Sequence, residues 1–228
     1  MEEEKLIQNR KQFWIGVTLL LITTVIVLPF PHNKLLGESL LLAIGIPPFS
    51  NMETYTGLHF VGIGSLILII ISLTYIAKSL SKWRIRIIIL TLILFSALPH
   101  VIVDTLQSTF ASGIYAISYE SERSQCSFQL EGGETEGEIK CSIFLENKRN
   151  KAVDFEIVFQ KSRFDEFETY SRLNQEGPYY FTLGPRESRY LEFNMKVDMS
   201  GEEIYSSRSR TDLVEIILRD NKGNERRL

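Results

Sequence analysis

Three long apolar runs in the first half of the chain constrain its fold more than any other feature. They read FWIGVTLLLITTVIVLPF, LHFVGIGSLILIIISLTYIA and IIILTLILFSALPHVIVDTL. At 1.5 Å per residue, a helix of this length crosses about 27 to 30 Å of hydrocarbon. No small-residue cleavage site follows the first run, so we expect it to remain as an anchor and not to be removed as a signal peptide. The sequence therefore predicts three transmembrane helices, at about 13–30, 58–78 and 86–106.

Charged residues become frequent only in the second half of the chain. From Glu120 onward, residues of both signs recur every few positions, as on an ordinary soluble surface. We therefore predict a membrane domain at 1–118 and a water-soluble domain at 119–228. The net charge of −3 leaves neither half with the basic surface that nucleic acids require, so no DNA or RNA partner is expected.

Lysine and arginine close to the spans predict the orientation, because these residues resist translocation across the membrane. Lys5, Arg10 and Lys11 precede the first run, and the basic loop KSLSKWRIR separates the second from the third. The loop at 31–57 holds only Lys34. We expect a multi-pass protein of the cell membrane with a cytoplasmic amino terminus and an extracytoplasmic second domain.

The loop between the first two runs has an apolar stretch of its own, SLLLAIGI at 39–46. It is followed by Pro47 and Pro48, and as a helix of about 12 Å it is too short to cross a bilayer. We expect a short helix at the outer interface of the membrane. A re-entrant segment that lines a substrate path is the alternative.

After the third run the apolar residues alternate with polar ones, which is the period of β-strands. One apolar face per strand predicts two antiparallel sheets packed against each other. The stretch at 161–177 fits neither period, and we expect a loop or a short helix there. The fold class is thus α+β with the two parts segregated. Six stretches alternate: 126–130, 139–145, 153–159, 179–183, 191–197 and 214–218.

About 110 residues with roughly seven strands and regularly placed turns resemble an immunoglobulin-like β-sandwich. The phrases LENKRNKAVDFEIVF and FTLGPRESRYLEF look like strand, turn and returning strand. The resemblance covers only the outer half of the chain, and it is to the extracytoplasmic immunoglobulin-like domain of bacterial multi-pass membrane proteins. The resemblance is one of fold, and it implies no catalytic residues.

Both cysteines lie on the apolar faces of neighbouring strands. If the hairpin turns at Gly133 and Glu134, Phe128 faces Ile139 and Cys126 faces Cys141. Outside the cytoplasm such a pair can form a stable disulfide. The alternative is two small apolar residues in the core.

No catalytic or cofactor motif occurs in the sequence, so we expect neither an enzyme nor a cofactor. Tyr180 is a candidate for stacking on a ligand. The cluster at 207–210 (Ser-Arg-Ser-Arg) is either a contact with anionic lipid or wall polymer, or a plain solvated loop. The glutamates at 131–138 are interpreted as a solvated turn, with weak calcium binding as the alternative.

All three histidines fall in the membrane half, close to one predicted membrane level. Counted along a helix from Arg86, Asp104 lies about 27 Å away, at the outer edge of the hydrocarbon. His100 lies one turn before it, and His59 and His32 flank the outer ends of the other two spans. We interpret these groups as marking the boundary between lipid and water. A metal or proton-sensing site built from His32, His59, His100 and Asp104 is the alternative.

These features predict a non-enzymatic protein that presents its soluble domain outside the cell for recognition of a protein or another envelope component. Besides the lipid bilayer, we expect the partner to be another envelope or membrane protein. The alternative is an accessory or sensory subunit of a membrane transporter or signalling complex, with the helices as its working part.

Overall fold

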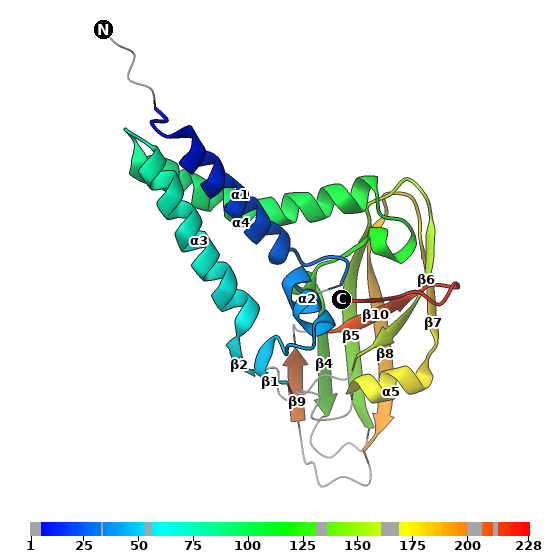
Figure 1. The fold of residues 1–228 in the computed structure, drawn as a ribbon. Helices are drawn as coiled ribbons and strands as arrows, with labels where there is room; N and C mark the ends of the chain where they lie inside the picture. The colour runs from blue at the N-terminus through cyan, green and yellow to red at the C-terminus, as the bar shows by residue number, and fades with distance from the viewer. Residues whose placement is uncertain are drawn as a thin grey trace. The chain divides into compact units, whose positions relative to one another are not determined.

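The computed structural model describes residues 6–32, 34–52, 56–130, 136–160, 169–199, 207–211 and 214–228. The chain divides into two compact units, Met1–Asp104 and Thr105–Leu228 (Figure 1). The first is mainly helical and the second is built mainly of antiparallel strands, as expected for a segregated α+β fold.

Two helices are long and apolar enough to cross a membrane in the part of the chain that the structure describes: α3 (Phe60–Ser79) and α4 (Arg84–Thr109). They correspond to the second and third apolar runs. The first run does not form the helix expected at 13–30, because α1 spans Arg10–Ile26 and has 17 residues. It ends ahead of Pro29, since proline lacks an amide donor and disfavours helical geometry in the residue before it. The prediction of three apolar helices of spanning length is thus corrected to two.

In the first unit, α1 packs antiparallel along α3. The backbone N–H of Gln8, just ahead of α1, donates to the carbonyl of Ser79 at the end of α3 over 2.8 Å. Near the middle of the hairpin, the Ser72 hydroxyl donates to the carbonyl of Gly16 over 2.6 Å. Small and hydroxyl-bearing residues thus let the two backbones approach closely. Those buried on the two helices are Gly16, Thr23, Thr24, Ser65, Ser72 and Ser79.

The segment between these helices contains α2 (Leu36–Ala43), β1 (Phe49–Asn51) and β2 (Thr56–His59). α2 begins three residues before the apolar stretch that predicted it, and Gly45 follows it with a φ of +79°, a conformation typical beyond a helix end. Gly37 of α2 faces Ile26 and Val61, whose side chains would lie 2.7 and 2.8 Å from an added Cβ.

The second unit contains two antiparallel sheets. One has the strand order β11-β10-β6-β7. In the other, β5 pairs with β8 on one side and with β4 and β3 on the other, and β9 forms the edge beyond β4 (Figure 1). The strands are β3 (Ile117–Tyr119), β4 (Gln125–Leu130), β5 (Glu136–Asn147), β6 (Val153–Phe159), β7 (Tyr179–Leu183), β8 (Ser188–Asp198), β9 (Ser207–Thr211), β10 (Ile216–Arg219) and β11 (Glu225–Arg227). Short helices complete the unit: η1 (Gly113–Ala116), η2 (Ser121–Arg123) and α5 (Thr169–Glu176).

The core of this unit lies between the sheets. Phe193 of β8 meets three rings from the opposite sheet edge to face, with centroid distances of 5.0 Å to Phe159, 4.9 Å to Tyr179 and 5.7 Å to Phe181. Such edge-to-face pairs stabilise a core beyond the area that they bury. The alternation in the sequence therefore predicted which faces of these strands turn inward.

Two expectations for irregular segments have different outcomes. The Ser-Arg-Ser-Arg cluster is part of β9 and not a loop, because Ser207 to Thr211 pair with β4 along its whole length. The stretch at 161–177 contains the short helix α5 from Thr169 onward. Residues 161–168 and the expected turn at 133–134 lie outside the described residues.

Candidate binding site on the four-stranded sheet

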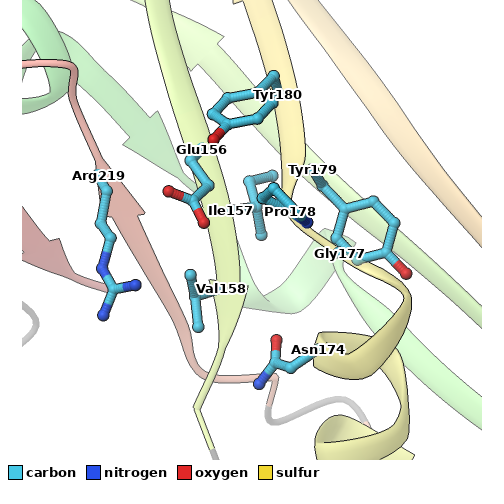
Figure 2. Close-up of a pocket in the computed structure, with 9 residues that line it drawn as sticks. All are labelled: Glu156, Ile157, Val158, Asn174, Gly177, Pro178, Tyr179, Tyr180 and Arg219. Atoms are coloured by element: carbon cyan, nitrogen blue, oxygen red, sulfur yellow. The ribbon is translucent and has the colours of Figure 1, made fainter.

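The outward face of the four-stranded sheet brings Tyr180, Glu156 and Arg219 into one row. The strand register pairs Glu156 with Tyr180 on one side and with Arg219 on the other. The neighbours Ile157 and Leu218 are buried, so alternation along the strands turns Glu156 and Arg219 outward. Figure 2 shows the Glu156 side chain between the Tyr180 ring and the Arg219 guanidinium.

These side chains line a hollow of about 380 Å³. Tyr180 is 72% exposed, the largest exposure of any tyrosine among the exposed apolar residues of the described chain. Arg219 donates from Nε to Oε1 of Glu225 over 2.7 Å, which fixes the guanidinium on the sheet. The remaining lining residues are Ile157, Val158, Asn174, Gly177, Pro178 and Tyr179.

One wall of the hollow is held by Asn174 of α5. Its Oδ1 accepts from the backbone N–H of Phe159 over 2.9 Å, and its Nδ2 donates to the Phe159 carbonyl over 2.7 Å. The Tyr179 hydroxyl donates to the carbonyl of Leu173 over 3.0 Å. Burial raises the pKa of Tyr179, and the nearby negative charge of Glu176 adds to the effect. The helix is therefore tied to β6 through Asn174 and to β7 through Tyr179, so the wall is held in place without a ligand.

The chemistry of this set favours binding. An exposed phenol ring offers stacking, and a carboxylate next to a guanidinium offers charged hydrogen bonds of both signs. Sequence reasoning found Tyr180 but missed Glu156 and Arg219. Glu156 lies 24 positions before Tyr180 in the sequence, and Arg219 lies 39 positions after it. Only the pairing register of β6 with β7 and β10 shows that the three residues are neighbours.

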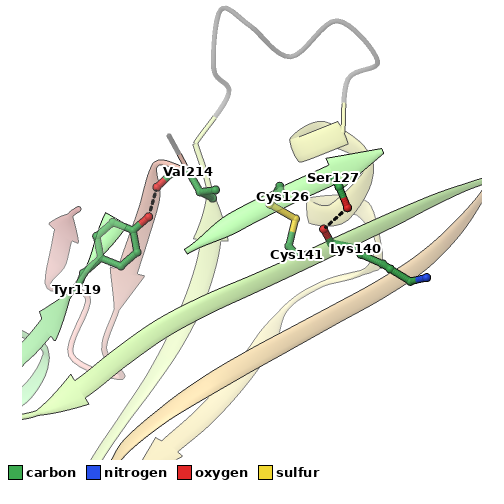
Figure 3. Close-up of a disulfide and its surroundings, with 6 residues drawn as sticks. All are labelled: Tyr119, Cys126, Ser127, Lys140, Cys141 and Val214. Atoms are coloured by element: carbon green, nitrogen blue, oxygen red, sulfur yellow. Dashed lines mark hydrogen bonds between the residues drawn. A yellow bond between two sulfur atoms is a disulfide. The ribbon is translucent and has the colours of Figure 1, made fainter. Parts of the chain in front are cut away.

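The cysteines occupy the other sheet. Cys126 and Cys141 are cross-strand partners, and their sulfur atoms are joined at 1.95 Å (Figure 3). Phe128 faces Ile139 in the same register, which confirms the pairing predicted from the apolar pattern. Both half-cystines are also buried in the core, at 2% and 3% exposure.

Near the disulfide, Tyr119 of β3 connects its sheet to the segment just before β10. Its hydroxyl donates to the carbonyl of Val214 over 2.5 Å (Figure 3). Burial raises the pKa of Tyr119 to about 12, so the phenol remains protonated, and able to donate, throughout the physiological range.

The histidines and Asp104 do not assemble into a metal site. Among the described residues no three His, Cys, Asp or Glu side chains gather closely enough to hold an ion. His100 and Asp104 lie exposed on α4, and His32 follows the end of α1.

His59 instead meets a residue that sequence reasoning did not select. Its Nε2 lies 2.9 Å from Oε1 of Glu38, close enough for an ion pair although the approach lacks hydrogen-bond geometry. Phe49 stacks on the imidazole with a centroid distance of 4.5 Å. The burial of Glu38, which is 9% exposed, could not be anticipated, because no sequence pattern indicates that α2 folds onto the start of α3.

No family model matches the chain, and neither a curated protein nor a solved structure resembles it at a significant level.

Proposed function

We propose that this is an integral membrane protein that presents an immunoglobulin-like domain on the extracytoplasmic side, where the hollow around Tyr180 binds another envelope or membrane protein. Its role is recognition and not catalysis.

The observation that carries the membrane assignment is the reversed burial in the first unit. Water-soluble helices bury leucine and isoleucine and expose small polar residues. Most of the α1–α3 hairpin does the opposite, because the hydroxyl side chains of Thr23, Thr24, Ser65, Ser72 and Ser79 are buried and most of its large apolar side chains are exposed, with Val61 and Ile76 as the buried exceptions. Packing of this kind is typical of helices whose outer surface is covered by lipid. The exposed apolar residues of the hairpin include Leu21, Ile22, Val25, Ile63, Leu66, Ile67 and Ile70.

The same hairpin supports an orientation. α1 extends about 26 Å and packs along α3. Its antiparallel arrangement puts residues 6–9 and 79–81 at one end. The basic residues Arg10, Lys11, Lys78 and Lys82 flank that end, so it is the cytoplasmic one. α4 then leads to the extracytoplasmic side.

The strand order supports an immunoglobulin-like topology. In that fold a G-F-C-C′ sheet faces an A-B-E sheet. Here β11-β10-β6-β7 matches the first order, and β4-β5-β8 matches the second. The disulfide between β4 and β5 lies within one sheet and so differs from the bridge between sheets in antibody domains.

Tyrosine and arginine in one preformed hollow favour a protein ligand, because these residues contribute most to recognition at protein interfaces. A photo-cross-linking amino acid in place of Tyr180 should form one discrete adduct in intact cells. The same probe at Asn194, exposed on the outer face of the other sheet, should not form it. Adding Arg219→Ala should abolish the adduct, and equal adducts at both positions would contradict the proposed site.

The pair of Glu38 and His59, next to the start of α3, favours a second candidate, an accessory or sensory subunit of a membrane complex, because a histidine beside a carboxylate can change its charge near physiological pH. Moving residues 105–228 onto a foreign single helix distinguishes the two functions. Binding at Tyr180 should survive the transfer if recognition is the function, and the activity of a complex subunit should be lost.

A further inference from the structure

A basic surface lies where the last turn of α4 meets the β-sandwich. Arg149, in the loop after β5, donates from Nη1 to the carbonyl of Ser108 over 3.0 Å and also to that of Thr109. Gln107 is buried and donates from Nε2 to the carbonyl of Ile117 over 3.1 Å. The end of the helix and the loop after β5 therefore form one rigid corner of the second unit.

The turn between β7 and β8 completes this corner. Asn147, fully buried, donates from Nδ2 to the carbonyls of Lys151 (2.7 Å) and Gly184 (2.8 Å). The backbone N–H of Arg186 donates to the carbonyl of Arg149 over 2.8 Å, and its Nε donates to Oδ1 of Asn150 over 3.0 Å. Cations from two loops are thus held side by side before any ligand arrives.

The charge of these two loops and their flanks is positive. They hold five cations, Lys148, Arg149, Lys151, Arg186 and Arg189, against two carboxylates, Glu146 and Glu187, which leaves 5 − 2 = +3. Both carboxylates are matched by neighbours, Glu146 by Lys148 at 2.8 Å and Glu187 by Arg189 at 3.6 Å.

The excess charge resides on Arg149, Lys151 and Arg186. Within the described part of the chain, no carboxylate forms an ion pair with any of the three. Phe110, which directly follows Thr109 at the end of α4, is 80% exposed. We call Phe110, Arg149, Lys151 and Arg186 the helix-exit surface.

The depth of this surface follows from the length of α4. Its 26 residues extend about 39 Å, which exceeds the hydrocarbon layer of about 30 Å and reaches the headgroup region beyond it. A helix that enters at Arg84 therefore ends at Thr109 among lipid phosphates. Exposed phenylalanine and basic side chains are the groups that suit this level of a membrane.

We propose that the helix-exit surface binds the phosphates of anionic lipid headgroups in the leaflet where α4 ends. Arg186 and Lys151 contact the phosphate oxygens, Arg149 adds its charge while it caps the helix, and Phe110 lies at the edge of the acyl chains. Guanidinium groups match phosphate oxygens in geometry as well as in charge. The inference rests on the proposed membrane function, because α4 must cross the bilayer.

Hydrogen–deuterium exchange on the full chain in nanodiscs tests this proposal. One set of discs contains phosphatidylcholine alone, and the other contains phosphatidylglycerol as well. In the anionic discs, amides at 148–152 and 184–188 should exchange slower by about threefold or more at low salt. High salt should remove the difference, because it screens exposed charges.

Matched variants separate this surface from charge in general. The double variant Lys151→Gln and Arg186→Gln should lose the lipid dependence. Arg208→Gln with Arg210→Gln removes the same charge from the edge strand β9 and should keep it. For each variant, amide exchange in the anionic discs is compared with exchange of the same variant in the phosphatidylcholine discs. A change in exchange rate that the substitution itself causes therefore cancels.

The outcomes distinguish the inference from the function on which it rests. Slow exchange of α3 and α4 in both discs reports insertion in the membrane. With insertion intact, equal exchange of the loops in both lipids overturns the inference alone, as does loss of the lipid dependence in both double variants. Fast exchange of both helices overturns the membrane proposal and the inference together.

Discussion

Gly16 is the residue on which the approach of α1 to α3 depends. A Cβ at this position would lie 2.7 Å from Cγ1 of Ile76 and 2.9 Å from the carbonyl oxygen of Ser72. The second atom belongs to the backbone, so it can move away only if the helices separate. The helix contact here requires the absence of a side chain.

Gly16→Val should therefore lower the free energy of unfolding of the hairpin by about 1 to 3 kcal/mol. Gly64→Val is the matched control, because nothing lies within 4 Å of a Cβ at Gly64 on the exposed side of α3. It should change stability by less than about 0.5 kcal/mol. Unfolding of the full chain in detergent, followed by helical circular dichroism, measures both, and equal losses would contradict the packing.

The sequence identified some residues of the candidate sites and missed others. Tyr180 was identifiable because every second residue of a half-buried strand must face outward. Its neighbours Glu156 and Arg219 were not identifiable, because a single sequence does not show the register in which distant strands pair. His59 was found as a candidate, but for a site that the structure does not form, since its neighbour is Glu38.

Among the elements, the β4–β5 hairpin is closed covalently. The disulfide joins Cys126 and Cys141, which are 15 residues apart, and such a link restricts the unfolded chain. Reduction should lower the free energy of unfolding by about 3 kcal/mol. Thermal unfolding of the full chain with and without reductant checks this, and the double variant Cys126→Ala, Cys141→Ala should be insensitive to reductant.

Mass spectrometry after thiol alkylation gives an independent measurement of the same bond. The unreduced protein should carry no alkylated cysteine, and the reduced protein should carry two. Two alkylated cysteines without reduction would show that the bond is absent.

Element types were more predictable than element ends. Helical and alternating periods identified α3, α4 and the six main strands, because burial imposes those periods directly. The end of α1 was missed because apolar residues continue past Ile26 although Pro29 stops the helix. β9 was missed because Ser207 to Arg210 contain no apolar residue. Only pairing with β4 makes this segment a strand.

For the whole molecule, the orientation is the property to test. Lys82 lies in the loop between α3 and α4, and Asn221 in the turn between β10 and β11, and both are exposed. A cysteine introduced at Asn221 should react with a membrane-impermeant maleimide on intact cells. One at Lys82 should react only after permeabilisation, since basic loops remain in the cytoplasm. The reversed pattern would place the sandwich inside.

The position of β9 in its sheet determines when, during synthesis, that sheet can be completed. β4 pairs with β5 as soon as both strands exist, but its other edge pairs, among the residues that the structure describes, with β9 alone, where Cys126 pairs with Thr211. Until residue 211 has left the ribosome, the backbone groups along that edge of β4 remain available to any other strand. A nascent chain stopped before β9 thus carries an open sheet edge, and about the last tenth of the sequence protects a strand that was made soon after α4.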